Sequence, residues 1–183
     1  SGVRGGFRVR QVSMARAELN DGQALEAIND LFIGQKTHVS ARYQLCLNGI
    51  CESQSSSGII VSTGAGSSGW LSSVLTGAMG IAQAQDQMIP VSDEATACSA
   101  RFDWEANYLM FSVREPFVSK TSSGEMVFGR IDENQILQVI SQMPQNGVIF
   151  SDGIEADYLD FNAGAIANIG LSPRKLHLVT QIV

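Results

Sequence analysis

Short segments rich in β-branched and aromatic residues recur along the chain, and turn-forming residues separate one from the next. These segments cover residues 7–19, 39–52, 59–61, 104–113, 125–131, 135–143, 148–150, 154–161 and 175–183. Strong turn signals lie between or within them, among them Asn48-Gly49, Asp152-Gly153 and Ser172-Pro173. Short strands at regular spacing with turn chemistry between them are typical of a β-sandwich or a related closed β architecture. We therefore predict a mainly β domain.

One helix is predicted, directly after a loop made only of small residues. The strand at 59–61 runs into the loop, which covers residues 62–69. Apolar residues then recur at helical spacing within 67–84: Leu71, Val74, Leu75 and Ala78. Residues 83–100 show no period, so a surface loop is expected there. The chain of 183 residues has the length of a single domain.

Charge and hydropathy exclude several classes of partner. A formal net charge of −6 argues against nucleic acid or an anionic membrane bound through a basic face. No apolar run reaches the ~18 residues of a membrane span. The chain begins at Ser1 rather than at methionine, so we expect a processed chain or an excerpt of a longer protein. His38 and His177 lack partners at ligand spacing, and neither a metal ligand nor a catalytic residue is assigned.

Two of the three cysteines are predicted to face each other. If Asn48-Gly49 forms a two-residue hairpin turn, Cys46 lies opposite Cys51 on the neighbouring strand. The pair could oxidise, but we expect reduced thiols in a cytoplasmic protein, because disulfides are rare in that compartment.

Asn29 and Asp30 interrupt an otherwise apolar segment at 24–34. Adjacent polar residues in such a run need hydrogen-bond partners, since an unpaired buried polar group costs ~1–3 kcal/mol. They indicate either a turn between short strands or a pair that faces a substrate, and the local sequence does not decide between the two. Asp152 and Asp157 are further candidates for lining a site, although a turn and the surface suit them better.

The loop Gly64-Ala65-Gly66 fits a structural turn or a binding loop. No Gly-Lys-Ser/Thr follows it, as a phosphate-binding Walker loop would require, and it lacks the spacing of a dinucleotide-binding fingerprint. A strand that ends in such small residues nevertheless lets a ligand approach the backbone closely.

Two motifs resemble those of a known family. Residues 57–70 read Ser-Gly-Ile-Ile-Val-Ser-Thr-Gly-Ala-Gly-Ser-Ser-Gly-Trp, which resembles the Asp-Gly-(Leu)-(Ile)-Val-Ser-Thr-Pro-Thr-Gly-Ser-Thr-Ala-Tyr motif of NAD kinases. Asn29-Asp30 resembles the Asn-Glu or Asn-Asp motif of the same family at the family's spacing. The stretches at 47–50 and 113–117 are also similar to it, so the resemblance spans most of the chain.

The resemblance implies a β-sandwich-like C-terminal domain of the NAD kinase and diacylglycerol kinase-like fold. In the complete two-domain enzyme, ATP and Mg²⁺ would serve phosphorylation of the 2′-hydroxyl on the adenosine ribose of NAD. The family's Gly-Gly-Asp-Gly-Thr motif is absent from these 183 residues. A preceding α/β domain is therefore expected to carry it, and this chain alone is expected to be inactive.

The same resemblance implies the partners and the site. The implied partners are an NAD-like dinucleotide, the α/β domain and further copies in a homo-oligomer. Carried over by position, the residues that would bind the dinucleotide come from the Asn-Asp pair and the loop: Asn29, Asp30, Ser57, Ala65, Ser68, Gly69, Trp70 and Ser73.

This chain departs from the family's motif at several positions. The family's aspartate is Ser57, its Pro-Thr is Gly64-Ala65, and its Ala-Tyr is Gly69-Trp70. These replacements change the charge and the volume of the implied pocket. A nucleotide-sensing module without kinase activity is therefore an alternative, as is a divergent lipid or diacylglycerol kinase-like relative.

Overall fold

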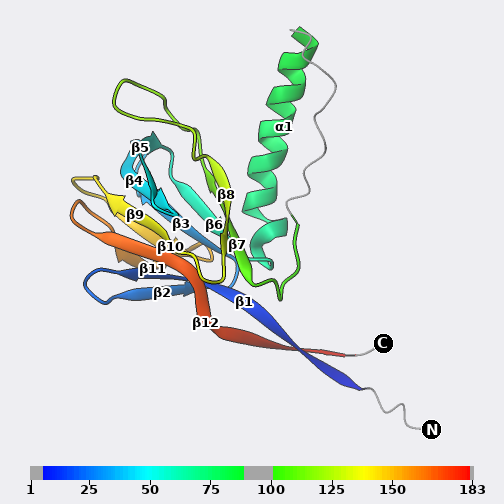
Figure 1. Ribbon diagram of the computed structural model, residues 1–183. Helices are drawn as coiled ribbons and strands as arrows, with labels where there is room; N and C mark the ends of the chain where they lie inside the picture. The colour runs from blue at the N-terminus through cyan, green and yellow to red at the C-terminus, as the bar shows by residue number, and fades with distance from the viewer. Residues whose placement is uncertain (1–5, 89–100, 182–183) are drawn as a thin grey trace.

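The computed structural model describes residues 6–88 and 101–181, which form two antiparallel six-stranded sheets packed face to face (Figure 1). The first sheet has its strands in this spatial order: β2 (Ala24–Ala27), β1 (Phe7–Leu19), β12 (Ile166–Gln181), β9 (Leu137–Ser141), β4 (Ala41–Leu47) and β5 (Ile50–Ser56). The second has this order: β11 (Ile154–Asp160), β10 (Gly147–Ser151), β3 (Asp30–Gln35), β6 (Ile59–Ser62), β7 (Tyr108–Val113) and β8 (Phe128–Asp132). The predicted mainly β fold with a helix after the small-residue loop is confirmed.

The core lies between the two sheets and follows from the alternation of side chains along each strand. On β3, Leu31 and Ile33 are completely buried in the core. Tyr43 is also fully buried in this core, and its hydroxyl hydrogen-bonds to Gln54 Oε1 at 3.1 Å. Because Leu31 and Ile33 face inward, Asp30, Phe32 and Gly34 lie on the outer face of the second sheet.

The ends of the described chain form a two-stranded ribbon that leaves the sandwich (Figure 1). In this ribbon β1 pairs with β12 from Phe7 opposite Gln181 to Ser13 opposite Lys175. Pro173 lies inside β12, so the predicted break at Ser172-Pro173 is wrong. The register shifts here, with Ser13 opposite Lys175 but Ala15 opposite Leu171, and such a bulge tolerates a residue without an N–H donor.

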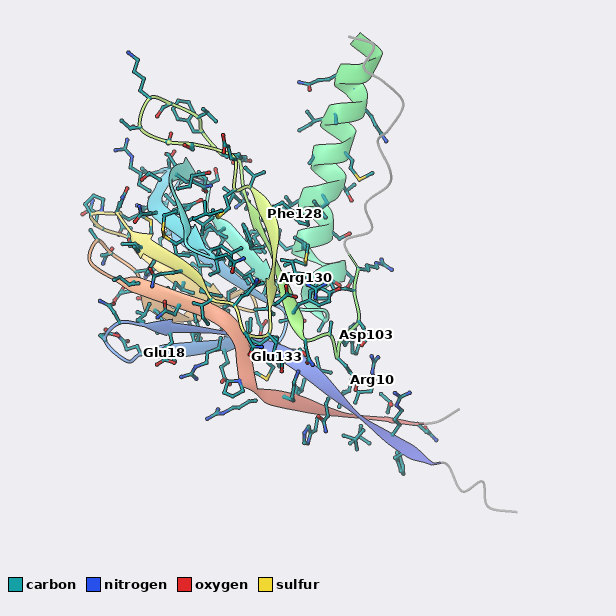
Figure 2. The ribbon with its side chains drawn as sticks, in the orientation of Figure 1. Arg10, Glu18, Asp103, Phe128, Arg130 and Glu133 are labelled. Atoms are coloured by element: carbon teal, nitrogen blue, oxygen red, sulfur yellow. A yellow bond between two sulfur atoms is a disulfide. The ribbon has the colours of Figure 1, made fainter. Side chains whose placement is uncertain are left out.

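The segment before β7 holds the base of this ribbon in place. Arg10 on β1 donates to Asp103 Oδ1 at 3.2 Å, and Figure 2 shows the two side chains close together. The backbone N–H of Ser13 donates to the carbonyl of Trp104 at 2.8 Å. Residues 104–107, predicted as the start of a strand, instead form a turn and loop, and β7 begins at Tyr108.

The predicted helix is α1 (Trp70–Met88), which follows a 3₁₀ turn at Gly66–Ser68 and stands away from the sheets (Figure 1). Helical structure therefore continues through residues 83–88, where a loop was predicted, and residues 89–100 lie outside the described part. Leu71 in its first turn is completely buried, whereas Ile81 is exposed. In the described part of the chain, no helix has the length and apolar character to cross a membrane.

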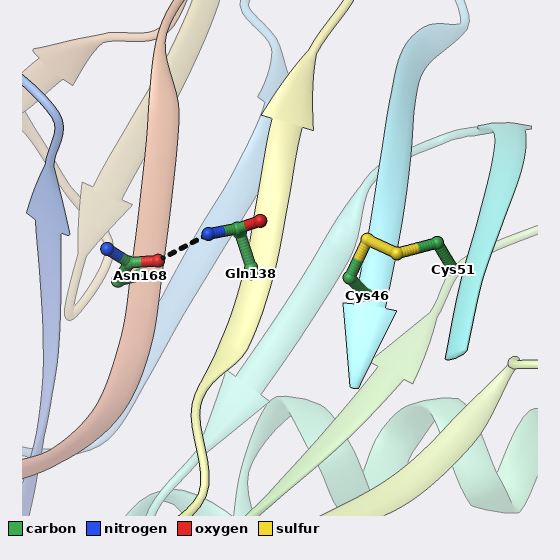
Figure 3. The surroundings of a disulfide bond; sticks show 4 residues. All are labelled: Cys46, Cys51, Gln138 and Asn168. Carbon is green, nitrogen blue, oxygen red and sulfur yellow. Dashed lines mark hydrogen bonds between the residues drawn. A yellow bond between two sulfur atoms is a disulfide. The ribbon is translucent and has the colours of Figure 1, made fainter. Parts of the chain in front are cut away.

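Cys46 and Cys51 form a disulfide between β4 and β5 (Figure 3). Their predicted pairing across the Asn48-Gly49 turn is confirmed, because Cys46 lies opposite Cys51 in the register. The predicted reduced state is wrong for this structure. Disulfides persist mainly in oxidising compartments and are rare in the cytoplasm. Nothing else in the described part of the chain supports the cytoplasmic location, which stays a prediction.

Candidate functional site

The candidate site lies at one edge of the second sheet, where three strand ends meet. Asp30 at the start of β3 pairs with Ser62 at the end of β6, and Leu31 pairs with Ser151 at the end of β10. The loop between β6 and α1 folds back over this edge and encloses a cavity of about 580 Å³. The residues that line the cavity are Asn29, Asp30, Phe32, Ala65, Gly66, Ser68, Gly69, Trp70, Phe150, Asp152 and Gly153.

Thr63 fastens the loop to the Asn29–Asp30 turn. Its backbone N–H donates to the carbonyl of Asn29 at 2.9 Å, and its hydroxyl donates to the carbonyl of Ile28 at 2.5 Å. The same hydroxyl oxygen accepts the N–H of Gly66 at 3.2 Å. Thr63 is completely buried, so these bonds form in a dry environment and fix the loop against the turn.

Two glycines allow the backbones around the loop to approach one another. A Cβ on Gly66 would stand 2.2 Å from the carbonyl oxygen of Asn29 and 2.8 Å from Oδ1 of Asp30. A Cβ on Gly64 would stand 1.9 Å from the carbonyl oxygen of Asp103. The backbone of residues 103–104 lies directly against Gly64, so a larger residue at this position would displace that backbone.

Gly66→Ala tests whether this close approach shapes the cavity. Because backbone lies within 2.2 Å of the added carbon, the loop must move away from Asn29. We expect a loss of about 2 kcal/mol in the free energy of unfolding, as for other overpacked positions. Chemical denaturation measures this loss. Gly77→Ala on α1 is the control, since nothing lies within 4 Å of its added carbon and alanine favours helix there. Equal stability of Gly66→Ala and the parent would contradict the steric argument.

Asp152 holds the Asn29–Asp30 turn from the other side. Its carboxylate accepts three backbone N–H groups: Ile28 at 2.9 Å, Asn29 at 2.6 Å and Asp30 at 3.2 Å. Asp152 itself has φ of 50° in the turn between β10 and β11. The predicted turn role therefore holds, but Asp152 also lines the cavity, whereas Asp157 is exposed on β11. Asp152 is a positioning residue for the pair that precedes β3.

Asp30 is a half-buried carboxylate with an incomplete set of hydrogen bonds. Its Oδ1 is buried and has no hydrogen-bond partner within residues 6–88 and 101–181. The pKa of Asp30 is raised from 3.8 to about 6, chiefly by burial; the hydroxyl of Ser62 lowers it and the nearby Asp152 carboxylate adds to the rise. Carboxylates with raised pKa values in a cavity are candidates for contact with a ligand.

Aromatic rings form the floor and one wall of the cavity. The ring of Phe32 lies against Gly34 and Gly58. The contact is so close that a Cβ added to either glycine would stand 2.6 Å from a ring carbon. Trp70, at the start of α1, stacks on Phe32 with 5.5 Å between ring centroids and 18° between planes. Phe150 lies beside Phe32 on the neighbouring strand at 6.3 Å.

The structure gathers most of the residues predicted for the site. The predicted residues that line the cavity are Asn29, Asp30, Ala65, Ser68, Gly69 and Trp70. Ser57 and Ser73 do not line it. The Ser57 hydroxyl donates to the carboxylate of Glu115 in a neighbouring hollow, and the exposed Ser73 donates to the carbonyl of Gly69, which precedes α1.

Sequence reasoning missed the aromatic floor. Phe32 lies two residues after Asp30, so strand alternation places both side chains on one face. That signal was present in the sequence. Phe150 offered no such signal, because its position beside Phe32 depends on the pairing of β10 with β3.

No family model and no curated protein matches the sequence of this chain. Among solved structures, the structure of yeast NADH kinase complexed with NADH is similar over 95% of this chain, with a TM-score of 0.65 and 11% sequence identity. This chain covers 45% of the length of that structure. At this identity the likeness concerns the fold alone: the two antiparallel sheets and the helix after the small-residue loop form an NAD kinase-like β domain.

Proposed function

We propose that this chain is the dinucleotide-binding domain of a kinase that acts on NAD or NADH. The observation that carries this proposal is the meeting of the Asn29–Asp30 turn and the Gly64–Trp70 loop around one cavity of about 580 Å³. Cavities of ≈ 300–1,000 Å³ are typical of small-molecule sites. The likeness to yeast NADH kinase complexed with NADH supports a dinucleotide as the ligand.

The side chains around the cavity suit a nucleoside. The carboxylate of Asp30 and the carboxamide oxygen of Asn29 are acceptors for ribose hydroxyl groups. The rings of Trp70 and Phe150 offer faces for stacking, which contributes ~1–3 kcal/mol per base in other nucleotide-binding proteins. Ribose hydroxyls at Asp30 and a base beside Trp70 would then be held at fixed positions.

Phosphoryl transfer would require a second domain in the complete enzyme. We expect ATP and Mg²⁺ to bind with the domain that carries the Gly-Gly-Asp-Gly-Thr motif. In the described residues of this chain, no group of three His, Cys, Asp or Glu side chains is placed to hold a metal ion. We therefore assign to this chain the binding and orientation of the dinucleotide, and no step that involves the metal. Formation of a homo-oligomer also stays a prediction.

Calorimetric titration of the protein with NAD and NADH tests this proposal. We expect binding of at least one of them and a loss of about tenfold in affinity for Trp70→Leu, since one stacking face is removed. Phe117→Leu is the matched control, because Phe117 is an exposed aromatic residue that does not line the cavity. If neither dinucleotide binds, or if the two variants behave alike, the proposal fails.

A turnover assay separates the kinase from the nucleotide-sensing alternative. The full-length protein with ATP and Mg²⁺ should convert the bound dinucleotide to its 2′-phosphate. Tight binding without any phosphorylated product would favour the sensing module, for which the replacements at Ser57, Gly64 and Ala65 are the sequence argument.

A further inference from the structure

A second hollow lies beside the dinucleotide cavity, on the far side of Phe32. It has a volume of about 420 Å³ and is formed by the segment after β3, by Ser57 and by the segment after β7. The residues that line it are Phe32, Gln35, Lys36, Thr37, His38, Val39, Ser40, Ser57, Arg114 and Glu115. Phe32 lines both hollows, so the two are neighbours that share this ring.

Two cations border this second hollow. Lys36 Nζ lies 3.4 Å from the ring centroid of Tyr158, and the Arg114 guanidinium lies 5.4 Å from the ring centroid of Trp70. Within the described residues, neither cation forms an ion pair within 4.0 Å, whereas Arg10, Arg16, Arg130 and Arg174 each do. Aromatic faces attract these cations without neutralising them, so their charge remains available to an anion.

The one carboxylate in the second hollow is engaged by a neighbour. Glu115 accepts a hydrogen bond from the Ser57 hydroxyl. It lies directly after β7 and its backbone has a φ of 49°. The side chains of Thr37 and Ser40 add hydroxyl donors. Two cations and several hydroxyls thus face a single carboxylate, which favours an anionic occupant.

Four aromatic rings form a continuous row, of which Phe32 is the ring that lines both hollows. Trp70 stacks on Phe32, Phe32 lies beside Phe150, and Phe150 meets Tyr158 edge to face at 5.8 Å. Arg114 lies over the first ring of this row and Lys36 over the last. A ligand that extends from Asp30 across this row meets hydrogen-bond acceptors first and then ring faces, with one cation at each end of the row.

A nucleotide carries its chemistry in the same order: ribose hydroxyls and a base, followed by an anionic phosphate group. Phe32 lies on β3 and Lys36 follows the end of that strand, four residues later, which is about 13 Å of extended chain. A phosphate chain attached to a nucleoside in the first cavity would point along this direction toward the second hollow.

We propose that the second hollow, with Lys36 and Arg114, is a subsite for the phosphate groups of the nucleotide bound in the first cavity. This proposal rests on the proposed function, because it takes the first cavity as the nucleoside site. Arg114 lies over one end of the aromatic row and Lys36 over the other, so each attracts the phosphate groups from its own side of the hollow while the rings hold the base.

Comparing adenosine with ADP tests the subsite, because the two ligands differ only in their phosphates. We expect the parent protein to bind ADP at least tenfold more tightly than adenosine in calorimetry at low salt. Lys36→Gln and Arg114→Gln should each lower this preference about threefold to fivefold and leave adenosine affinity within about twofold. Hydrogen bonds to charged groups contribute enough to account for such changes.

Arg42→Gln is the control, because it removes the same charge from an exposed arginine that lines other hollows and not this one. Arg114→Lys should keep most of the preference for ADP, which separates the effect of charge from the contact with Trp70. Inorganic pyrophosphate should bind at least tenfold more weakly than ADP, since it lacks the nucleoside.

The outcomes separate this proposal from the proposed function. If NAD, NADH and adenosine all fail to bind, the proposed function fails and the subsite fails with it. If adenosine binds but the preference for ADP is absent, or persists unchanged in both glutamine variants, the subsite alone is wrong. Pyrophosphate that binds as tightly as ADP would contradict the link between the two hollows.

Discussion

Replacing Asp30 by alanine is expected to weaken dinucleotide binding about a hundredfold, because a ribose hydroxyl loses its charged acceptor and a charge-assisted hydrogen bond contributes about 1.5–3 kcal/mol. The fold should survive, since Oδ1 of Asp30 has no partner in the described residues and its removal breaks no hydrogen bond at that atom. Calorimetric titration with NAD measures the affinity. Asp157→Ala is the control, because Asp157 is exposed on β11 away from the cavity.

The affinity for NAD should also depend on pH through Asp30. The pKa of Asp30 is raised to about 6, so the carboxylate gains its charge as the pH rises from 5 to 7. A charged acceptor binds a hydroxyl more strongly than a neutral one, and we expect affinity to rise by about fivefold over this range. Asp30→Asn should remove the dependence. A parent protein whose affinity is flat from pH 5 to 7 would contradict the assignment of Asp30 as the acceptor.

Asp30 should also lower stability at neutral pH in the absence of ligand. Its pKa is raised from the ordinary value of 3.8 to about 6 in the folded chain, so the folded state binds the proton more tightly than the unfolded state. The resulting stability is fully present below pH 4 and is lost as the pH rises through 6. The free energy of unfolding of Asp30→Asn, relative to that of the parent, should therefore be about 1–2 kcal/mol higher at pH 7.5 than at pH 4. This value allows for the partial solvation of Asp30.

A polar group that binds a ligand often lowers the stability of the protein in the absence of that ligand. Denaturant unfolding of both proteins at the two pH values measures the difference. An asparagine variant that gains nothing at pH 7.5 would indicate that water or a neighbouring group already stabilises the charge of Asp30.

Much of the fold could be predicted from local signals. The Asn48-Gly49 turn, with φ of 52° and 80° at its two residues, fixes the β4–β5 register that places Cys46 opposite Cys51. The end of β6 at Ser62 follows from the change to small residues. By contrast, Ser172-Pro173 wrongly predicts a strand break, because no local signal shows that a bulge in the pairing with β1 accommodates the proline.

The site could be predicted only in part, for a related reason. Asn29, Asp30 and the loop carry recognisable motifs, and these lie close together because β3 pairs with β6. Asp152 is separated from Asp30 by 122 residues, and only the tertiary structure brings its carboxylate to the turn. The local sequence Asp152-Gly153 indicates a turn and does not indicate which amides the side chain reaches. Ser57 is a different case, since its motif position lies in the neighbouring hollow and not in the first cavity.

Asp152→Ala is expected to have the largest effect on stability of any single change at this site. Three backbone N–H groups of residues 28–30 would lose their acceptor at once. Hydrogen bonds to a charged group contribute ≈ 1.5–3 kcal/mol each when buried. These amides are partly exposed, so water replaces some of what is lost, and we expect a decrease of about 3 kcal/mol in the free energy of unfolding. Denaturant unfolding measures this decrease.

Asp152→Asn separates the hydrogen bonds from the turn that Asp152 occupies. Asparagine adopts a positive φ readily and keeps one acceptor oxygen, so the variant should lose about half as much stability as the alanine variant. Oδ1 of Asp152 accepts the N–H groups of both Asn29 and Asp30. If the carboxamide oxygen of the asparagine takes the position of Oδ1, the variant should retain much of the turn. Its dinucleotide affinity should then exceed that of the alanine variant. If both variants lose equal stability while affinity is unchanged, Asp152 acts only as a turn residue and does not position the Asn29–Asp30 pair.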